Sequence, residues 1–295
     1  LQQVRKGLAT RQEMADAMLA RIAEGGPVRS SDFERTEGQK GGGWWDWKDE
    51  KLVLELLFSA GELMVARRRN FQRVYDLRER VRPGADENLP TLDEANRALA
   101  RESVRAMGIA RRAWVPGYLF HYELRTVALK ATAELVKDGE LLEVEVEGWP
   151  EPGVVHPDNS ALLEAVREAG YEHSRTEVLS PFDPVTWDRA RAFELFGFDY
   201  KIECYTPAPK RVYGYFTLPI LHDGQLVGRL DPKAHRKLGV FEVKSVHLEP
   251  WVSVTHELVT ELKDTLRRCA KWHGTPELVV RAANGPGLAE ALGRG

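Results

Sequence analysis

Arginines gather around a short polar turn in the first third of the chain. Three stand at 67–69, and a fourth, Arg73, follows Asn70-Phe71-Gln72. Guanidinium groups near the tip of a hairpin can neutralise DNA phosphates or enter a minor groove. The flanking runs are short and β-prone, which predicts such a hairpin. The alternative is a hairpin whose charges only face water, and we favour DNA contact because helical segments precede the hairpin.

A cluster of aromatic residues comes before this hairpin. Trp44, Trp45 and Trp47 stand where a glycine-rich loop meets an expected helix. Aromatic rings can wedge between base steps or stack on an unpaired base, but such clusters more often belong to a core. We assign at least two of the three to the core. Lys48 and Lys51 are the better candidates for a side that faces DNA.

Three later segments also carry cations. The block 207–215 presents Lys210 and Arg211 between prolines and tyrosines, and the polar loop expected at 231–237 contains His235. Each could face phosphates, and an ordinary strand entry or hairpin loop is about as good an interpretation. Around Arg189, carboxylates and cations are mixed, which favours structural ion pairs.

Signatures of several enzyme classes are absent from the sequence. His256 and Glu257 lack the second histidine of a zinc-protease motif, no phosphate-binding loop ends in Gly-Lys-Ser/Thr, and no Gly-x-Ser-x-Gly elbow occurs. The eight histidines show no ligand spacing, and two cysteines are too few for a zinc module. We therefore expect no metal and no cofactor.

The elements around the basic hairpin are expected in a definite order. A capping-box pattern at 10–13 opens a helix that ends at Gly25, a short second helix begins at Ser30, and a third runs to about Ala60. Three helices followed by a hairpin is the order of a winged helix, in which the third helix enters the major groove.

The same pattern repeats further along the chain. Residues 90–94 form a second capping box, at the start of a helix that ends near Gly108. A short helix is expected at 116–119 and a third ends at Gly139. The run 142–148 then alternates like a strand. This second wing is acidic, so we expect it to be structural or to face a partner.

Beyond about residue 175 the chain is rich in β-prone runs, and His222-Asp223-Gly224 predicts a hairpin turn. We therefore predict an α+β chain, with tandem winged helices followed by a β-rich, barrel-like C-terminal domain and a terminal helix. The expected boundaries are 9–82 and 89–157 for the winged helices, 175–275 for the β-rich domain and 276–295 for a flexible tail.

Composition limits the remaining function classes. The chain of 295 residues has a net charge of −3 and no apolar run long enough to span a membrane. Two cysteines fit a reducing cytosol. A basic stretch at 67–73 and an acidic one at 140–177 make a polarised molecule, so the small net charge does not exclude DNA binding. We expect a cytoplasmic, nucleoid-associated monomer.

Several stretches together resemble a known family, the bacterial tandem-winged-helix DNA glycosylases that unhook interstrand crosslinks and remove alkylated bases (the YcaQ and AlkZ group). No single stretch is specific, whereas the set is. The resembling stretches are 26–33 (GPVRSSDF), 43–48 (GWWDWK), 70–77 (NFQRVYDL), 179–184 (LSPFDP) with 187–189 (WDR), and 205–211 (YTPAPKR) with 213–215 (YGY).

The resemblance implies three winged helices and a barrel-like domain around a DNA channel, and hydrolysis of N-glycosidic bonds without a cofactor. The family signature, Gln-hydrophobic-Asp/Gln in the first winged helix, can position and activate a water near C1′ of the lesion. None of the six glutamines here begins that motif. Because the chain starts at Leu1 rather than Met, we interpret it as N-terminally truncated, with winged helices that correspond to the family's second and third.

Two functions remain. The chain is either a member of this repair family that lacks its catalytic residues, or a non-enzymatic winged-helix regulator or damage sensor; whether the chain as given is an enzyme stays open. A partner-binding module that uses the acidic wing is a weaker third option. The expected partner is double-stranded DNA, with a preference for damage. The candidate DNA contacts are Arg29, Ser30, Lys48, Lys51, Arg67, Arg68, Arg69, Arg73, Arg189, Lys210, Arg211 and His235.

Overall fold

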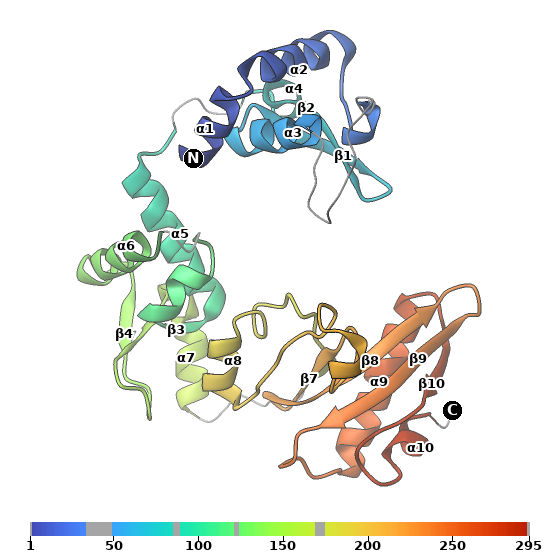
Figure 1. The fold of residues 1–295 in the computed structure, drawn as a ribbon. Coiled ribbons are helices and arrows are strands. Elements are labelled where there is room, and N and C mark those ends of the chain that lie inside the picture. Colours follow the sequence, from blue (N-terminus) through green and yellow to red (C-terminus); the bar gives the residue numbers. More distant parts are fainter. Residues whose placement is uncertain (1, 34–48, 85–88, 121–123, 169–174, 294–295) are drawn as a thin grey trace. The chain divides into compact units, whose positions relative to one another are not determined.

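A computed structural model describes residues 2–33, 49–84, 89–120, 124–168 and 175–293 (Figure 1). The chain divides into two compact units, Leu1–Leu89 and Pro90–Gly295, which we call unit 1 and unit 2. Their helices and strands make an α+β fold. Among the residues described, no helix is long and apolar enough to cross a membrane.

Unit 1 consists of helices and one hairpin. Its two main helices bury Met18, Ile22, Val53 and Leu57 in one core with the base of the hairpin, because these apolar residues recur at helical spacing. The elements are α1 (Gln2–Ala9), α2 (Gln12–Gly25), the 3-10 helix η1 (Ser30–Asp32), α3 (Asp49–Ala60), β1 (Leu63–Arg69), β2 (Gln72–Leu77) and α4 (Arg78–Val81).

The hairpin predicted from the arginine-rich segment is confirmed. β1 and β2 pair antiparallel, and the register ends with Arg69 opposite Gln72. The connecting residues are Asn70 and Phe71, whose φ angles are +48° and +65°. Two consecutive positive φ angles in a two-residue connection define a type I′ turn, whose twist matches that of the strands.

The two predicted capping boxes have different outcomes. Thr10 does not cap α2, because α1, which the sequence did not predict, ends just before it and the Thr10 hydroxyl donates to the carbonyl of Gly7 at 2.9 Å. The second box is confirmed. Thr91 Oγ1 accepts the N–H of Glu94 at 3.2 Å, and the Glu94 carboxylate accepts the N–H of Thr91 at 2.8 Å.

The first part of unit 2 has a core of its own, which contains Val104, Val115, Ala128, Leu135 and Val154. In its three-stranded sheet β5 lies between β3 and β4, and β4 ends at Val144, so the strand expected over 142–148 is shorter than predicted. The elements are α5 (Leu92–Met107), β3 (Ile109–Arg111), η2 (Arg112–Gly117), α6 (Arg125–Lys137), β4 (Leu142–Val144), β5 (Gly153–Val155), η4 (Pro157–Asn159) and α7 (Ser160–Arg167).

The second part of unit 2 is a five-stranded sheet in the order β10-β9-β8-β7-β6 (Figure 1). Bulges after Ile220 and Asp231 bend its long strands, and the sheet curls into a half-barrel. The hairpin turn at Asp223-Gly224 is confirmed. The elements are β6 (Thr176–Val178), α8 (Arg189–Phe196), η5 (Ala208–Lys210), β7 (Leu218–His222), β8 (Gln225–His235), β9 (Val240–Leu248), α9 (His256–Trp272), β10 (Glu277–Val280) and α10 (Leu288–Gly293).

The C-terminal segment differs from the flexible tail predicted over 276–295. Residues 277–280 form β10, which pairs in parallel with β9, and α10 buries Leu288 and Leu292 in the same core as α9. Small and polar residues near the end suggested fraying, but five apolar side chains in 278–292 pack in or against this core and dock the segment.

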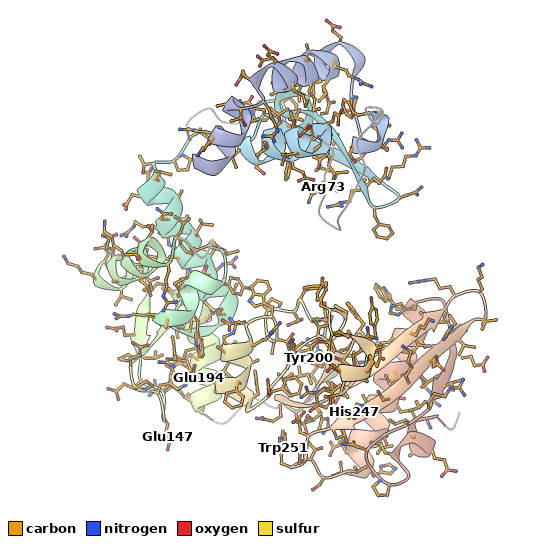
Figure 2. The ribbon with its side chains drawn as sticks, viewed as in Figure 1. Arg73, Glu147, Glu194, Tyr200, His247 and Trp251 are labelled. Atoms are coloured by element: carbon orange, nitrogen blue, oxygen red, sulfur yellow. The ribbon has the colours of Figure 1, made fainter. Side chains whose placement is uncertain are left out.

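The two parts of unit 2 are joined by side chains. Arg111 on β3 pairs with Glu194 on α8, and the ring of Tyr118 lies 5.1 Å from that of Trp187. Glu194 is labelled in Figure 2. Unit 2 thus contains both segments that the sequence assigned to domains, 89–157 and 175–275, and these contacts lie between them.

Candidate nucleic-acid interface

The hairpin of unit 1 exposes three cations. Arg67, Arg68 and Arg69 are all exposed on β1. Arg68 donates to the carbonyl of Phe71 across the turn at 3.2 Å. Arg67 and Arg69 have no side-chain hydrogen bond or ion pair with any residue that the structure describes. Uncompensated guanidinium groups on a rigid hairpin are suited to phosphate contact, since each can displace counterions from DNA.

Arg73, the fourth predicted arginine, is held by the protein. From β2 its side chain projects toward α3 (Figure 2), where Nη1 lies 2.7 Å from Glu55 Oε2 and 3.4 Å from the hydroxyl of Tyr75. Its guanidinium also lies 5.3 Å from the centre of the Phe58 ring. Hydrogen bonding to Tyr75 and the charge of Glu55 raise the pKa of Arg73. Arg73 therefore fastens the hairpin to α3.

Four of the candidate residues line one pocket. A pocket of about 300 Å³ lies between η1, α3 and the hairpin, and Ser30, Lys51, Arg68 and Arg73 are among its lining residues. The structure thus brings together cations that are far apart in sequence. Lys48 and the three tryptophans at 44, 45 and 47 lie outside the described residues.

Arg29 is engaged locally. Its Nη2 lies 2.6 Å from Asp32 Oδ1, and its backbone N–H donates to Asp32 Oδ2 at 2.8 Å. Hydrogen bonding to Arg29 lowers the pKa of Asp32. The pair closes the turn of η1, so Arg29 shares its charge with a carboxylate rather than presenting it alone.

In unit 2 two buried carboxylates, Glu203 and Asp231, accept hydrogen bonds from a run of backbone N–H groups. Glu203 accepts the N–H groups of Val212, Tyr213 and Gly214 at 2.7 to 3.1 Å. Burial opposes ionisation of Glu203, but these N–H groups more than offset it and lower its pKa. Asp231 accepts the next two N–H groups, of Tyr215 and Phe216, at 3.0 and 3.3 Å. Five consecutive N–H groups are therefore fixed from inside, which makes the segment 212–216 rigid.

A buried arginine supports the same segment. Arg229 on β8 is 2% exposed and lies between aromatic rings, 4.4 Å from the centre of Phe198 and 4.2 Å from that of Tyr213. It donates to Glu249 at 2.6 Å and to the carbonyl of Asp199 at 2.8 Å. The stack holds Tyr213 in place, and Tyr213 in turn contacts the ring of His247, labelled in Figure 2.

The residues just before this rigid segment, together with Tyr215 within it, present cations and rings to solvent. Lys210 is exposed, and Arg211 stacks 4.8 Å from the centre of the Tyr215 ring while donating to the carbonyl of Thr206. Tyr205 is 88% exposed. Exposed aromatic rings beside cations suit contacts with nucleotides. The sequence indicated the cations, but the role of Tyr205 depends on an exposure that it does not show.

His235 and its neighbours are arranged differently from the prediction. Residues 231–235 belong to β8 rather than to a loop, and His235 Nε2 lies 2.9 Å from Glu242 Oε2 on β9. The turn that follows exposes Arg236 and Lys237. Sequence reasoning chose His235 because it placed the turn too early.

Arg189 is exposed at the first turn of α8, with no side-chain partner among the described residues. The sequence favoured structural ion pairs around Arg189, but Asp188 and Arg191 make hydrogen bonds with backbone groups there. Asp188 caps α8 by accepting the N–H of Arg191 at 3.1 Å, and the buried guanidinium of Arg191 donates to the carbonyl of Pro184. Burial lowers the pKa of Arg191.

One group of possible metal ligands was missed by the sequence. Ligand atoms of His222, Asp223 and Glu261 lie within 4.8 Å of one another, because the β7–β8 turn meets α9. His222 Nδ1 is 2.7 Å from the hydroxyl of Thr176, which makes a hydrogen bond that competes with coordination. The separation of Glu261 from the other two along the chain hides this group from spacing arguments.

Comparisons with known proteins agree with the resemblance. The family described as DNA glycosylase AlkZ-like matches residues 3–272. The solved structure of DNA glycosylase AlkZ from Streptomyces sahachiroi is similar to this chain, with a TM-score of 0.53 and 19% identity over 78% of this chain. The match covers 57% of that protein, so this chain spans little more than half of its length. By the extent of the family match, the chain belongs to the AlkZ-like DNA glycosylase family.

Proposed function

We propose that this chain binds double-stranded DNA, with a preference for alkylated or crosslinked duplex, and that the hairpin of unit 1 is a primary contact. On this proposal residues 9–82 and 89–157 are winged helices that correspond to the family's second and third. The observation that carries it is the set of exposed arginines at 67–69 on a hairpin anchored to α3 by Arg73 and Glu55. Family membership supports the choice of DNA as the partner.

We further propose that the chain as given binds without hydrolysis. Its sequence holds no Gln-hydrophobic-Asp/Gln motif, which the resemblance assigns to catalysis. The test compares binding to an intact duplex and to the same duplex with an N7-alkylguanine crosslink, and then assays the bound crosslinked DNA for unhooked strands. We expect tighter binding to the crosslinked duplex and no unhooking. Turnover by this chain would refute the claim that it lacks its catalytic residues.

The missing motif also favours a second candidate, a winged-helix regulator that recognises a sequence. Selection from a random duplex pool separates the two. Enrichment of one motif, together with equal affinity for damaged and intact copies of it, would support the regulator and overturn the repair proposal. No enrichment together with a preference for the lesion is the result that the repair proposal expects.

A further inference from the structure

Phe71 stands in a conformation that its side chain disfavours. Its φ of +65° lies in the left-handed region, where a Cβ is crowded and which is sparsely populated by residues other than glycine, asparagine and aspartate. In a type I′ turn the preferred second residue is glycine. A large aromatic residue at this position therefore strains the turn without being needed to form it.

The chain itself supplies the unstrained version of this turn. β7 and β8 are joined by Asp223 and Gly224, with φ angles of +46° and +72°, close to those of Asn70 and Phe71. The same backbone geometry is thus built once with the favoured sequence and once with phenylalanine. Turn geometry gives no reason for the ring at position 71.

The ring of Phe71 is not part of a hydrophobic core either. Phe71 is 94% exposed, the largest exposed fraction among the described large apolar residues, and it sits at the tip of the hairpin whose β1 strand carries Arg67, Arg68 and Arg69. Strained backbone conformations cluster at functional sites, so an exposed residue held in one is a candidate for a functional role. Apolar side chains flanked by cations are used by DNA-bending proteins as wedges, which enter between base steps and kink the duplex.

We propose that Phe71 is such a wedge, inserting between base pairs of duplex DNA while the neighbouring arginines hold the phosphates. This inference rests on the proposed binding of DNA by the hairpin. It adds two claims: binding bends the duplex, and part of the binding free energy comes from apolar contact by the Phe71 ring. That part does not depend on salt concentration. The arginine part, by contrast, weakens as salt rises, because it depends on the release of counterions.

The test uses the full chain, an intact duplex labelled at both ends for energy transfer, and the variants Phe71→Gly and Phe71→Leu. We expect Phe71→Gly to raise the melting temperature of the protein by relieving the turn, and to weaken binding by about tenfold. The slope of log affinity against log salt should stay that of the wild type. At saturating protein the bend, seen as increased energy transfer, should disappear. Phe71→Leu keeps an apolar wedge and should retain most of the bend.

The matched control is Asn70→Gly, which alters the same turn and leaves the ring in place; its affinity and bend should equal those of the wild type. Wild-type binding without a bend, or a Phe71→Gly variant that bends DNA as before, would overturn the wedge while leaving the proposed function standing. A reduced salt slope in Phe71→Gly would also overturn it, because the ring would then only support the arginines. Absence of any duplex binding by the wild type would overturn both proposals.

Discussion

Arg73 Nη1 on β2 lies 2.7 Å from Glu55 Oε2 on α3, across 18 residues of sequence. The other oxygen of Glu55 accepts the hydroxyl of Tyr75 at 2.9 Å. One carboxylate therefore joins a helix to the returning strand of the hairpin. The sequence grouped all four arginines together, but the structure gives them two roles. Arg73 positions the hairpin, whereas the arginines at 67–69 remain available to a ligand.

Glu55→Gln should loosen this junction and free Arg73. Because both partners are partly exposed, we expect a loss of about 1 kcal/mol in the free energy of unfolding, measured by urea titration. Duplex affinity should rise two- to threefold or so, since a negative charge beside the interface is removed. Glu62→Gln removes the same charge from an exposed site outside the junction of Glu55, Arg73 and Tyr75, and should change neither quantity as much. A fall in duplex affinity for Glu55→Gln would contradict this view of Arg73.

Gly214→Ala should disrupt the rigid segment of unit 2. A Cβ at position 214 would lie 2.5 Å from Asp231 Oδ2, and the φ of +140° is itself unfavourable for alanine. We expect a loss of at least about 2 kcal/mol in unfolding free energy. Gly274→Ala is the control: its φ is +69°, but nothing lies within 4 Å of the added Cβ, so a cost of about 1 kcal/mol is expected. Equal costs at the two positions would show that the carboxylate contact does not hold the segment.

His247 should make unit 2 less stable as the pH falls below neutrality. Burial, and then the charge of Arg229, lower its pKa, while Glu203 acts in the opposite direction; the ring of Tyr213 packs on its edge. The folded protein then binds a proton less readily than the unfolded chain, whose histidine has a pKa of about 6.5. Stability is therefore fully present above that pKa and is lost on going below it.

The measurement is the unfolding free energy between about pH 7.5 and pH 5.5. His247→Gln should flatten its decline, whereas His256→Gln, at an exposed histidine of the same unit, should preserve it. An unchanged decline in His247→Gln would show that another group carries the pH dependence.

Patterns within a few residues predicted structure well where nothing else competed for the same groups. The hairpin turn and the box at Thr91 formed as expected, because their donors and acceptors lie within the segment itself. Thr10 has the same pattern, but its hydroxyl is taken by the end of α1. The family was also predicted, since the resembling stretches identify it as a set, and the match over residues 3–272 confirms it.

Contacts between residues far apart along the chain could not be predicted from the sequence. Glu203 and Asp231 are 28 positions apart, and nothing local indicates that both would be buried under one run of N–H groups. Burial of a carboxylate is normally unfavourable and is tolerated here only because the donors converge on it. The strain at Phe71 was equally hidden, since its φ depends on the register that β1 and β2 adopt.

The most direct test of the account is the salt dependence of duplex binding by a variant that carries Arg67→Gln, Arg68→Gln and Arg69→Gln. A control variant with Arg5→Gln, Lys6→Gln and Arg78→Gln loses the same charge from other exposed positions of unit 1. Each lost phosphate contact lowers the slope of log affinity against log salt by about 0.9. We predict that the hairpin variant loses between two and three such contacts and the control none or nearly none. Equal slopes for the wild type and the hairpin variant, or equal losses in the two variants, would contradict the claim that the hairpin contacts DNA.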